Sequence, residues 1–217
     1  MRYAAILLLL AACRAGSPTR PTGPLHVVIA GDSVAHGEGD ESRLGLARHL
    51  DRELTRLGIV HDATIDLAIS GSRTANLARV IAAKRALIAN ADAIVVSIGG
   101  NDLYGDSTAR LLTAVAPRLM IDVVAERVAS IVRTLERESD ARIVLLGVYD
   151  PYRKPQLDAD VSRWSAKLYE RFANDRRVQV ITIADLFVAR RRISPIDGFH
   201  PNVDAYERIA RRVAEAL

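Results

Sequence analysis

The chain has 217 residues, which is the size of one ordinary α/β domain. Apolar residues make up 49% of it and the mean hydropathy is +0.09, so a core can form and wholesale disorder is excluded. The single cysteine excludes an intrachain disulfide and a cysteine-based metal cluster. Of the 30 basic residues, three lie in residues 1–24 without any acid. The other 27, against 26 acids, leave a net charge of only +1, which gives little support to nucleic-acid binding.

The first residues predict export from the cell. Residues 1–13 read M-R-Y-A-A-I-L-L-L-L-A-A-C, with one cation before an apolar run that ends in small residues, as in a secretory signal peptide. This run is well short of the ~20 residues that a membrane-spanning helix needs. Its end, Leu10-Ala11-Ala12-Cys13, resembles the lipobox of bacterial lipoproteins, in which the cysteine is acylated.

The lipobox resemblance implies a signal peptide over residues 1–12 and a lipidated Cys13 that begins a tether over residues 13–24. The tether is rich in Pro, Gly, Ser and Thr, a composition typical of flexible linkers. The protein is then expected at the bacterial cell envelope, held to the membrane through Cys13. The alternative is a plain secretory signal, and in that case the protein is secreted.

Predicted strands and helices alternate over residues 25–217, the expected folded domain. Short apolar runs with β-branched residues predict strands, and apolar residues at helical spacing predict helices. Strands that are apolar throughout predict a parallel sheet covered on both faces, and therefore a three-layer α/β/α sandwich. In chain order the elements are strand Leu25–Ala30, helix Ser42–Leu57, strand Ala63–Ile69, helix Thr74–Asn90, strand Ala93–Ile98, helix Arg118–Glu138, strand Arg142–Val148, helix Asp158–Phe172, strand Val178–Ile183 and helix Asn202–Leu217.

Small and polar residues follow the first three strands, at the edge of the sheet where ligands of such folds bind. Gly31-Asp32-Ser33 follows the first strand and can present a serine hydroxyl, although an Asp/Ser helix cap is equally compatible. Gly71 follows the second strand and can leave a backbone N–H open to a ligand, although a turn glycine with Ser/Thr capping fits equally well. After the third strand, Asn101 offers an uncharged amide donor, which suits an oxyanion hole, although turns use the same residue types.

Asp197 and His200 stand three residues apart, just before the last helix. The aspartate can accept the Nδ1–H of the histidine, which leaves Nε2 free to act as a base. The same D-x-x-H pair could be half of a metal site, but the other histidines are scattered along the chain. No metal site is predicted.

Ser33, Gly71, Asn101 and His200 occur in this order, each after the appropriate element. The set resembles the SGNH (GDSL) hydrolase family, whose name gives these four residue types, and within it the small thioesterases, lysophospholipases and arylesterases. G-x-N-D and D-x-x-H-P are complete, whereas Val34 replaces the usual leucine after the serine. The resemblance implies a flavodoxin-like five-stranded parallel sheet and no cofactor. It also implies catalytic Ser33, Asp197 and His200, with an oxyanion hole of the Ser33 and Gly71 N–H groups and the Asn101 side chain.

The expected activity is hydrolysis of carboxylic esters or thioesters, small-molecule or lipid, through an acyl-Ser33 intermediate. O-acyl transfer or glycan deacetylation would use the same residues, and a non-catalytic binding lipoprotein is a further alternative. No insertion is long enough to form a lid, so short to medium acyl chains are expected. Candidate walls of the substrate pocket are the apolar and aromatic side chains of Leu103, Tyr104, Tyr149, Tyr152 and Phe199, although these could simply cover the sheet.

Other charged residues are expected to serve the structure. Asp32 is expected to bond local backbone or an arginine, and Asp102 to support the loop of Asn101. The arginine runs 190–192 and 211–212 are interpreted as solvated faces, with contact to anionic lipid headgroups as the alternative.

Overall fold

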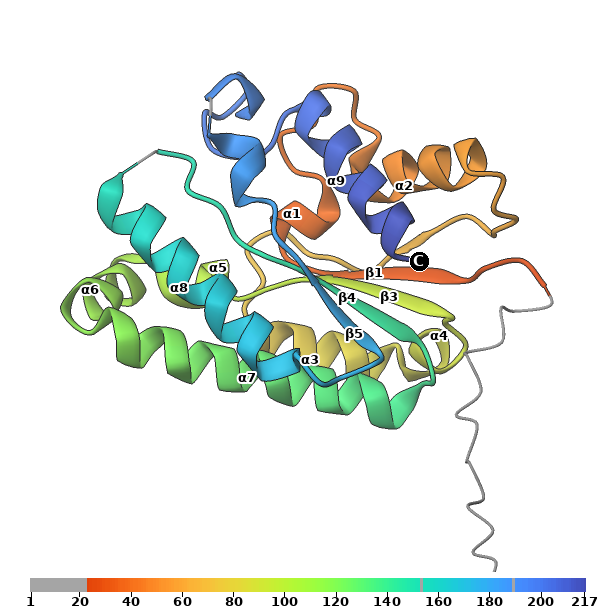
Figure 1. The fold of residues 1–217 in the computed structure, drawn as a ribbon, viewed down its shortest axis with the longest axis horizontal. Coiled ribbons are helices and arrows are strands. Elements are labelled where there is room, and N and C mark those ends of the chain that lie inside the picture. The colour runs from red at the N-terminus through yellow and green to blue at the C-terminus, as the bar shows by residue number, and fades with distance from the viewer. Residues whose placement is uncertain (1–22, 153, 189) are drawn as a thin grey trace, which may run out of the picture.

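The computed structural model describes residues 23–152, 154–188 and 190–217, so the predicted signal peptide, Cys13 and most of the tether lie outside the described residues. One five-stranded parallel sheet runs through the middle of the molecule (Figure 1). Its strands are β1 (Val27–Gly31), β2 (Ile65–Asp66), β3 (Ala93–Ser97), β4 (Arg142–Leu146) and β5 (Val178–Ile181). Their order, β2-β1-β3-β4-β5, is that of a flavodoxin-like sheet, and it confirms the predicted fold class.

The central strands are buried on both faces, which explains why they are apolar throughout. All residues of β1 and β3 are buried, and these strands pair in register from Val27 with Ala93 to Gly31 with Ser97. The predicted strand at residues 63–69 is longer than the regular strand β2, which is Ile65–Asp66, although the N–H groups of Leu67 and Ile69 still donate to the Ile29 and Gly31 carbonyl oxygens of β1. Ile65 and Asp66 are exposed at the edge of the sheet, where no neighbouring strand extends the pairing.

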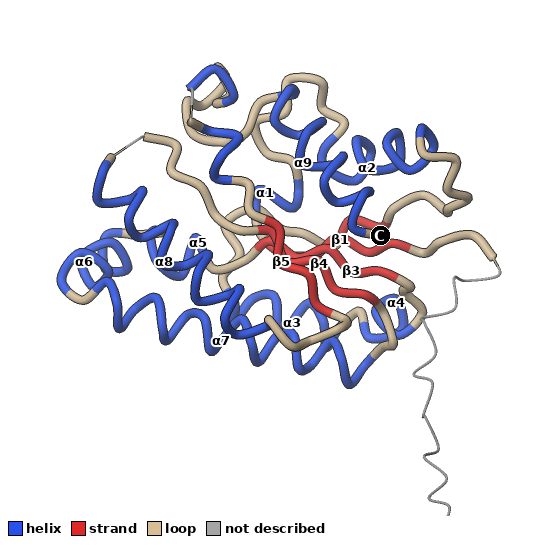
Figure 2. The backbone as a smooth tube through the Cα atoms, in the orientation of Figure 1, coloured by secondary structure: helices blue, strands red, loops and turns tan. Residues whose placement is uncertain are grey.

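Two layers of helices cover the sheet (Figure 2). Val27 and Ile29 of β1 point into one core with helices α1 (Ser33–His36), α2 (Gly45–Arg56) and α9 (Val203–Ala216). Val28 and Ala30 point into the other core. It is completed by α3 (Thr74–Ala83), α4 (Arg85–Ala89), α7 (Pro117–Glu138) and α8 (Pro155–Phe172). Both cores consist almost entirely of aliphatic side chains, in keeping with the low aromatic content.

The helices depart from prediction mainly at their ends and around the third strand. α7 and α8 begin at Pro117 and Pro155, because proline fits the first helical position, where no N–H is needed. The predicted helix at residues 74–90 is divided at Lys84 into α3 and α4. The predictions missed α5 (Gly100–Tyr104) and α6 (Ser107–Val115). The large apolar residues of α6 are exposed, so the helix does not have the apolar face toward the core by which amphipathic helices are recognised in a sequence.

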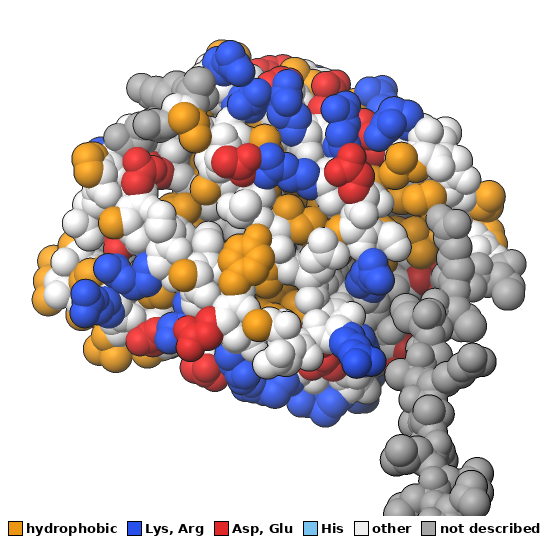
Figure 3. All heavy atoms as spheres, in the orientation of Figure 1, with side chains coloured by type: hydrophobic (Ala, Val, Ile, Leu, Met, Phe, Trp, Pro, Cys, Tyr) orange, Lys and Arg blue, Asp and Glu red, His pale blue; other side chains and the backbone are white. Residues whose placement is uncertain are grey.

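The arginine runs do not form a simple solvated face. Arg192 is buried, so the interpretation was wrong for this residue: its Nε donates to Asp204 Oδ2 at 2.8 Å and its Nη1 donates to the Leu186 carbonyl oxygen at 2.8 Å. Arg212 forms an ion pair with Asp185. Figure 3 shows Lys and Arg side chains interspersed with Asp and Glu over α9 and the segment before it. Within the described ranges, no helix is long and apolar enough to cross a membrane.

Candidate active site

Ser33 is held at the carboxyl end of β1 by a turn that requires glycine. Gly31 has φ +137°, and a Cβ atom there would lie 1.9 Å from the Ser97 carbonyl oxygen on the adjacent strand β3. Asp32 then caps α1, because its Oδ1 accepts the Val34 N–H at 3.1 Å. Ser33 is therefore the first residue of a one-turn helix, directly at the end of a central strand.

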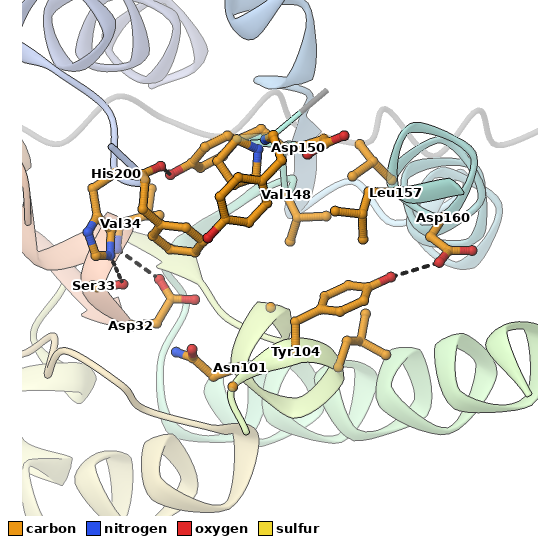
Figure 4. A pocket seen from close by; sticks show the side chains of 18 of the residues that line it. Asp32, Ser33, Val34, Asn101, Tyr104, Val148, Asp150, Leu157, Asp160 and His200 are labelled. Atoms are coloured by element: carbon orange, nitrogen blue, oxygen red, sulfur yellow. Dashed lines mark hydrogen bonds between the residues drawn. The ribbon is translucent and has the colours of Figure 1, made fainter. Parts of the chain in front are cut away.

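His200 and Asp197 come from the loop before α9 and meet Ser33 at this edge of the sheet. The Nε2 atom of His200 lies 2.9 Å from Ser33 Oγ (Figure 4), and its Nδ1 atom lies 2.7 Å from Asp197 Oδ2. Asp197 Oδ1 accepts the backbone N–H groups of Phe199 and His200, which fixes the carboxylate. Partial burial opposes its ionisation, but these hydrogen bonds and the one with the imidazole outweigh burial and hold the pKa of Asp197 below its usual range.

Gly71 and Asn101 lie beside Ser33, at the ends of the neighbouring strands. One N–H of the Asn101 side-chain amide donates to the Ser72 carbonyl oxygen at 3.0 Å, which fixes the amide and leaves its second N–H available. Within the described part of the chain, the backbone N–H groups of Ser33 and Gly71 donate to no other group. Three N–H groups are therefore free to donate to a ligand beside Ser33.

Asp102 holds the segments that carry Gly71 and Asn101 together. Its carboxylate accepts the backbone N–H of Thr74 at 2.9 Å and the Thr74 hydroxyl at 2.6 Å. Since Asp102 is on α5 and Thr74 begins α3, these bonds tie the Asn101 helix to the segment that follows Gly71.

A cavity of about 950 Å³ opens beside Ser33. All five predicted wall residues, Leu103, Tyr104, Tyr149, Tyr152 and Phe199, line it together with Ser33, Gly71, Asn101, Asp197 and His200. Other lining residues were not predicted, among them Val148, Asp150, Leu157 and Asp160. A signal for Asp160 was present in the sequence, because it stands at helical spacing with the apolar residues Trp164, Leu168 and Phe172 of α8.

Asp32 is a buried carboxyl directly beside the candidate nucleophile. Its Oδ1 also accepts the Ser97 hydroxyl at 2.8 Å, so it bonds local backbone and a serine rather than an arginine. Burial raises the pKa of Asp32 to about 6, against the lowering effect of the hydrogen bonds from Ser97 and Val34. In the described ranges, no group of three or more His, Cys, Asp or Glu side chains is placed to hold a metal ion.

A model of the GDSL-like lipase/acylhydrolase family matches residues 29–208. The chain belongs to this family. This GDSL-type ester hydrolase is 26% identical over 243 aligned residues to the uncharacterized protein YpmR of Bacillus subtilis (strain 168), and the match covers 99% of this chain and 93% of YpmR.

Solved structures share the fold of this GDSL hydrolase. The lipase Lip_vut3 from a goat rumen metagenome superposes with a TM-score of 0.76 at 19% identity, over 88% of this chain and 97% of the lipase. The acetylxylan esterase Axe2 of Geobacillus stearothermophilus has a TM-score of 0.67 at 16% identity, over 89% and 94% of the two chains.

The environment of Asp32 predicts a pH-dependent stability. The pKa of about 6 in the folded protein lies above the ordinary value of 3.8, so the folded state binds more protons than the unfolded state between these values. The free energy of unfolding therefore decreases as Asp32 ionises with rising pH. Asp32→Asn keeps an acceptor for Val34 and Ser97 but has no charge to bury. The free energy of unfolding of Asp32→Asn minus that of wild type should therefore increase by up to about 3 kcal/mol as the pH rises from about 4 to about 7.

Urea unfolding of both proteins across this range measures the difference. A difference that stays constant with pH would show that the Asp32 carboxyl titrates normally in the folded protein.

Proposed function

We propose that this GDSL hydrolase is a serine esterase that cleaves carboxylic esters or thioesters of short to medium acyl chains through an acyl-Ser33 intermediate. The observation that carries the proposal is the chain of contacts at the site: Ser33 Oγ lies 2.9 Å from His200 Nε2, and His200 Nδ1 lies 2.7 Å from Asp197 Oδ2. A serine, a base and a carboxylate within hydrogen-bond reach of one another are the elements of nucleophilic acyl transfer.

In the first half of the reaction, Ser33 Oγ attacks the carbonyl carbon and His200 Nε2 takes its proton. Asp197 keeps the Nδ1–H of His200 in place and stabilises the imidazolium. The negative charge that develops on the carbonyl oxygen is stabilised by the N–H groups of Ser33 and Gly71 and by the free amide N–H of Asn101. His200 then gives the proton to the leaving alcohol or thiol, and the acyl group stays on Ser33.

In the second half, His200 Nε2 takes a proton from water, whose oxygen attacks the acyl carbonyl carbon. The same three N–H groups stabilise the oxyanion. The bond to Ser33 Oγ breaks, the proton returns to this oxygen from His200, and the carboxylic acid leaves. Apart from the ester and water, these steps use only groups of this chain.

The shape of the cavity supports the proposed chain length. Its walls include Leu103, Val148 and Leu157, which suit an alkyl chain. A bonded polar pair, Tyr104 and Asp160, lines the part of the cavity that lies away from Ser33 (Figure 4). Since a methyl group gains nothing against a buried carboxylate, chains long enough to reach this pair should be poorer substrates.

The proposal is tested with p-nitrophenyl esters from acetate to palmitate. We expect Ser33-dependent hydrolysis that is fastest for short or medium chains, and Ser33→Ala should lose it because no other group replaces the nucleophile. Ser130→Ala is the matched control, since Ser130 is exposed on α7, outside the cavity. Hydrolysis that persists in Ser33→Ala, or a wild-type protein inert on every ester, would contradict the proposal.

Removal of the Asn101 amide tests the proposed oxyanion hole. Asn101→Ala is predicted to lower kcat by about 10²–10³ with a smaller effect on KM, because the amide acts on charge that exists only in the transition state. Steady-state kinetics on the best ester measures this, with the exposed Asn174→Ala as control. A decrease in kcat of less than about tenfold would show that other donors stabilise the oxyanion.

We also propose that the protein is exported and anchored to the cell envelope through an acylated Cys13, on the support of the Leu10-Ala11-Ala12-Cys13 sequence. In a bacterial host, the full-length protein is expected in the membrane fraction, and Cys13→Ser is expected to leave that fraction because the acylation site is lost. Fractionation with immunodetection measures the distribution. Equal distribution of the two proteins would argue against a lipid anchor and favour a plain secretory signal.

A further inference from the structure

The cavity wall away from Ser33 includes a polar pair that the proposed mechanism does not use. The Tyr104 hydroxyl donates to Asp160 Oδ2 at 2.8 Å, and Arg163 Nη1 donates to Asp160 Oδ1 at 3.2 Å. Asp160 is only 4% exposed, yet it lines the cavity. In Figure 4, His200 and Ser33 lie at one side of the view and the bonded pair at the other, with Val148 and Leu157 facing Tyr104.

The acyl part of an ester is the part that reaches this pair. His200 must protonate the leaving group, so the alcohol or thiol departs on the His200 side of Ser33. The cavity extends from Ser33 past Asn101 and away from His200, toward Tyr104 and Asp160 (Figure 4). The carbonyl carbon is bonded to Ser33 in the intermediate, so the far end of the acyl chain points to the pair.

Asp160 has acceptor capacity left for a ligand. A carboxylate offers about four acceptor positions, and Tyr104 and Arg163 occupy two of them. Burial, followed by the bond to Asp160, raises the pKa of Tyr104 well above its usual range, so its hydroxyl stays protonated and keeps donating. By contrast, Asp150 uses its carboxylate on the backbone N–H groups of Tyr152 and Lys154 in its own loop.

The charges around the cavity favour a neutral donor. Arg163 already pairs with Asp160, and the cations Lys154 and Arg110 also line the cavity. An ammonium group would meet these cations, whereas a hydroxyl can donate to Asp160 and accept from a neighbouring group without any added charge. A methyl group at the same place would leave the carboxylate without a partner for its remaining lone pairs.

We propose that Tyr104 and Asp160 form a distal subsite that binds a hydroxyl group at the far end of the acyl chain, so that hydroxylated acyl esters are preferred over plain alkyl esters of the same length. The inference rests on the proposed esterase activity and specifies the substrate class of that site.

Two ester series of matched length test the subsite. One series is p-nitrophenyl butanoate, hexanoate, octanoate and decanoate, and the other has the same esters with a terminal hydroxyl group. For each protein, kcat/KM on every ester is divided by the kcat/KM of that protein on p-nitrophenyl acetate. In the wild type, the hydroxylated ester should be preferred about tenfold or more at the length that reaches Asp160. Asp160→Leu should abolish or reverse that preference. Asp158→Leu should retain it, because Asp158 is exposed on the same helix and does not line the cavity.

Two further measurements keep the inference falsifiable. If Asp160→Leu does not fold, Asp160→Asn should lower the preference, since only one of its side-chain oxygens can still accept. If no ester is hydrolysed, calorimetric titration of the Ser33→Ala protein with octanoate and with 8-hydroxyoctanoate measures the affinity of the subsite for each acid. The hydroxylated acid should bind more tightly.

The outcomes separate the two proposals. Ser33-dependent acetate hydrolysis with no hydroxyl preference at any length, or with a preference that Asp160→Leu retains, overturns the distal subsite alone. Absence of Ser33-dependent hydrolysis overturns the esterase proposal, and equal binding of the two acids in that case overturns the subsite as well.

Discussion

The hydrogen bond between Ser33 Oγ and His200 Nε2 joins residues 167 positions apart, and the two ends of the domain must meet for it to form. Ser33 is fixed by β1, a central strand, through a turn in which only glycine avoids the Ser97 carbonyl oxygen of β3. His200 precedes α9, which packs against α2 on one face of the same sheet. The geometry of the proposed nucleophile and base therefore depends on the core under α2 and α9.

The loop between α1 and α2 supports this contact from the side. Gly39 lies so close to the base that a Cβ atom there would be 2.6 Å from His200 Cβ. The loop is held by Asp40, whose buried carboxylate accepts hydrogen bonds from Ser42 and from the backbone at Leu44 and Gly45, and which lies 3.0 Å from His49 Nε2. A buried polar network that is bonded in this way favours one arrangement of the loop, and so one position of His200.

The strands, and the polar residues that follow them, could be predicted from the sequence. Buried strands of a parallel sheet are apolar throughout, so β1, β3, β4 and β5 were recognised, and the polar residues after the strands marked the edge that carries the site. The five wall residues were also predicted: four of them follow the third and fourth strands, whose carboxyl ends flank that edge, and Phe199 stands next to His200.

Features that depend on tertiary packing could not be predicted from the sequence in the same way. β2 lies at the edge of the sheet and its regular part is only Ile65–Asp66, which no local pattern in the sequence specifies. Arg192 is buried because Asp204 and the Leu186 carbonyl oxygen come to it from other parts of the chain. Asp160 faces the cavity because α5 brings Tyr104 to it, and the sequence marks it only as an acid among the apolar residues of α8.

The account depends on Ser33 being a nucleophile that His200 activates. The most direct measurement is labelling of the full domain with a fluorophosphonate, which forms a stable bond to activated serine hydroxyls, followed by peptide mass spectrometry. The account predicts one adduct, on Ser33, which is lost in His200→Ala while the protein remains folded. Labelling of a different serine, or labelling of Ser33 that is unchanged in His200→Ala, would contradict it.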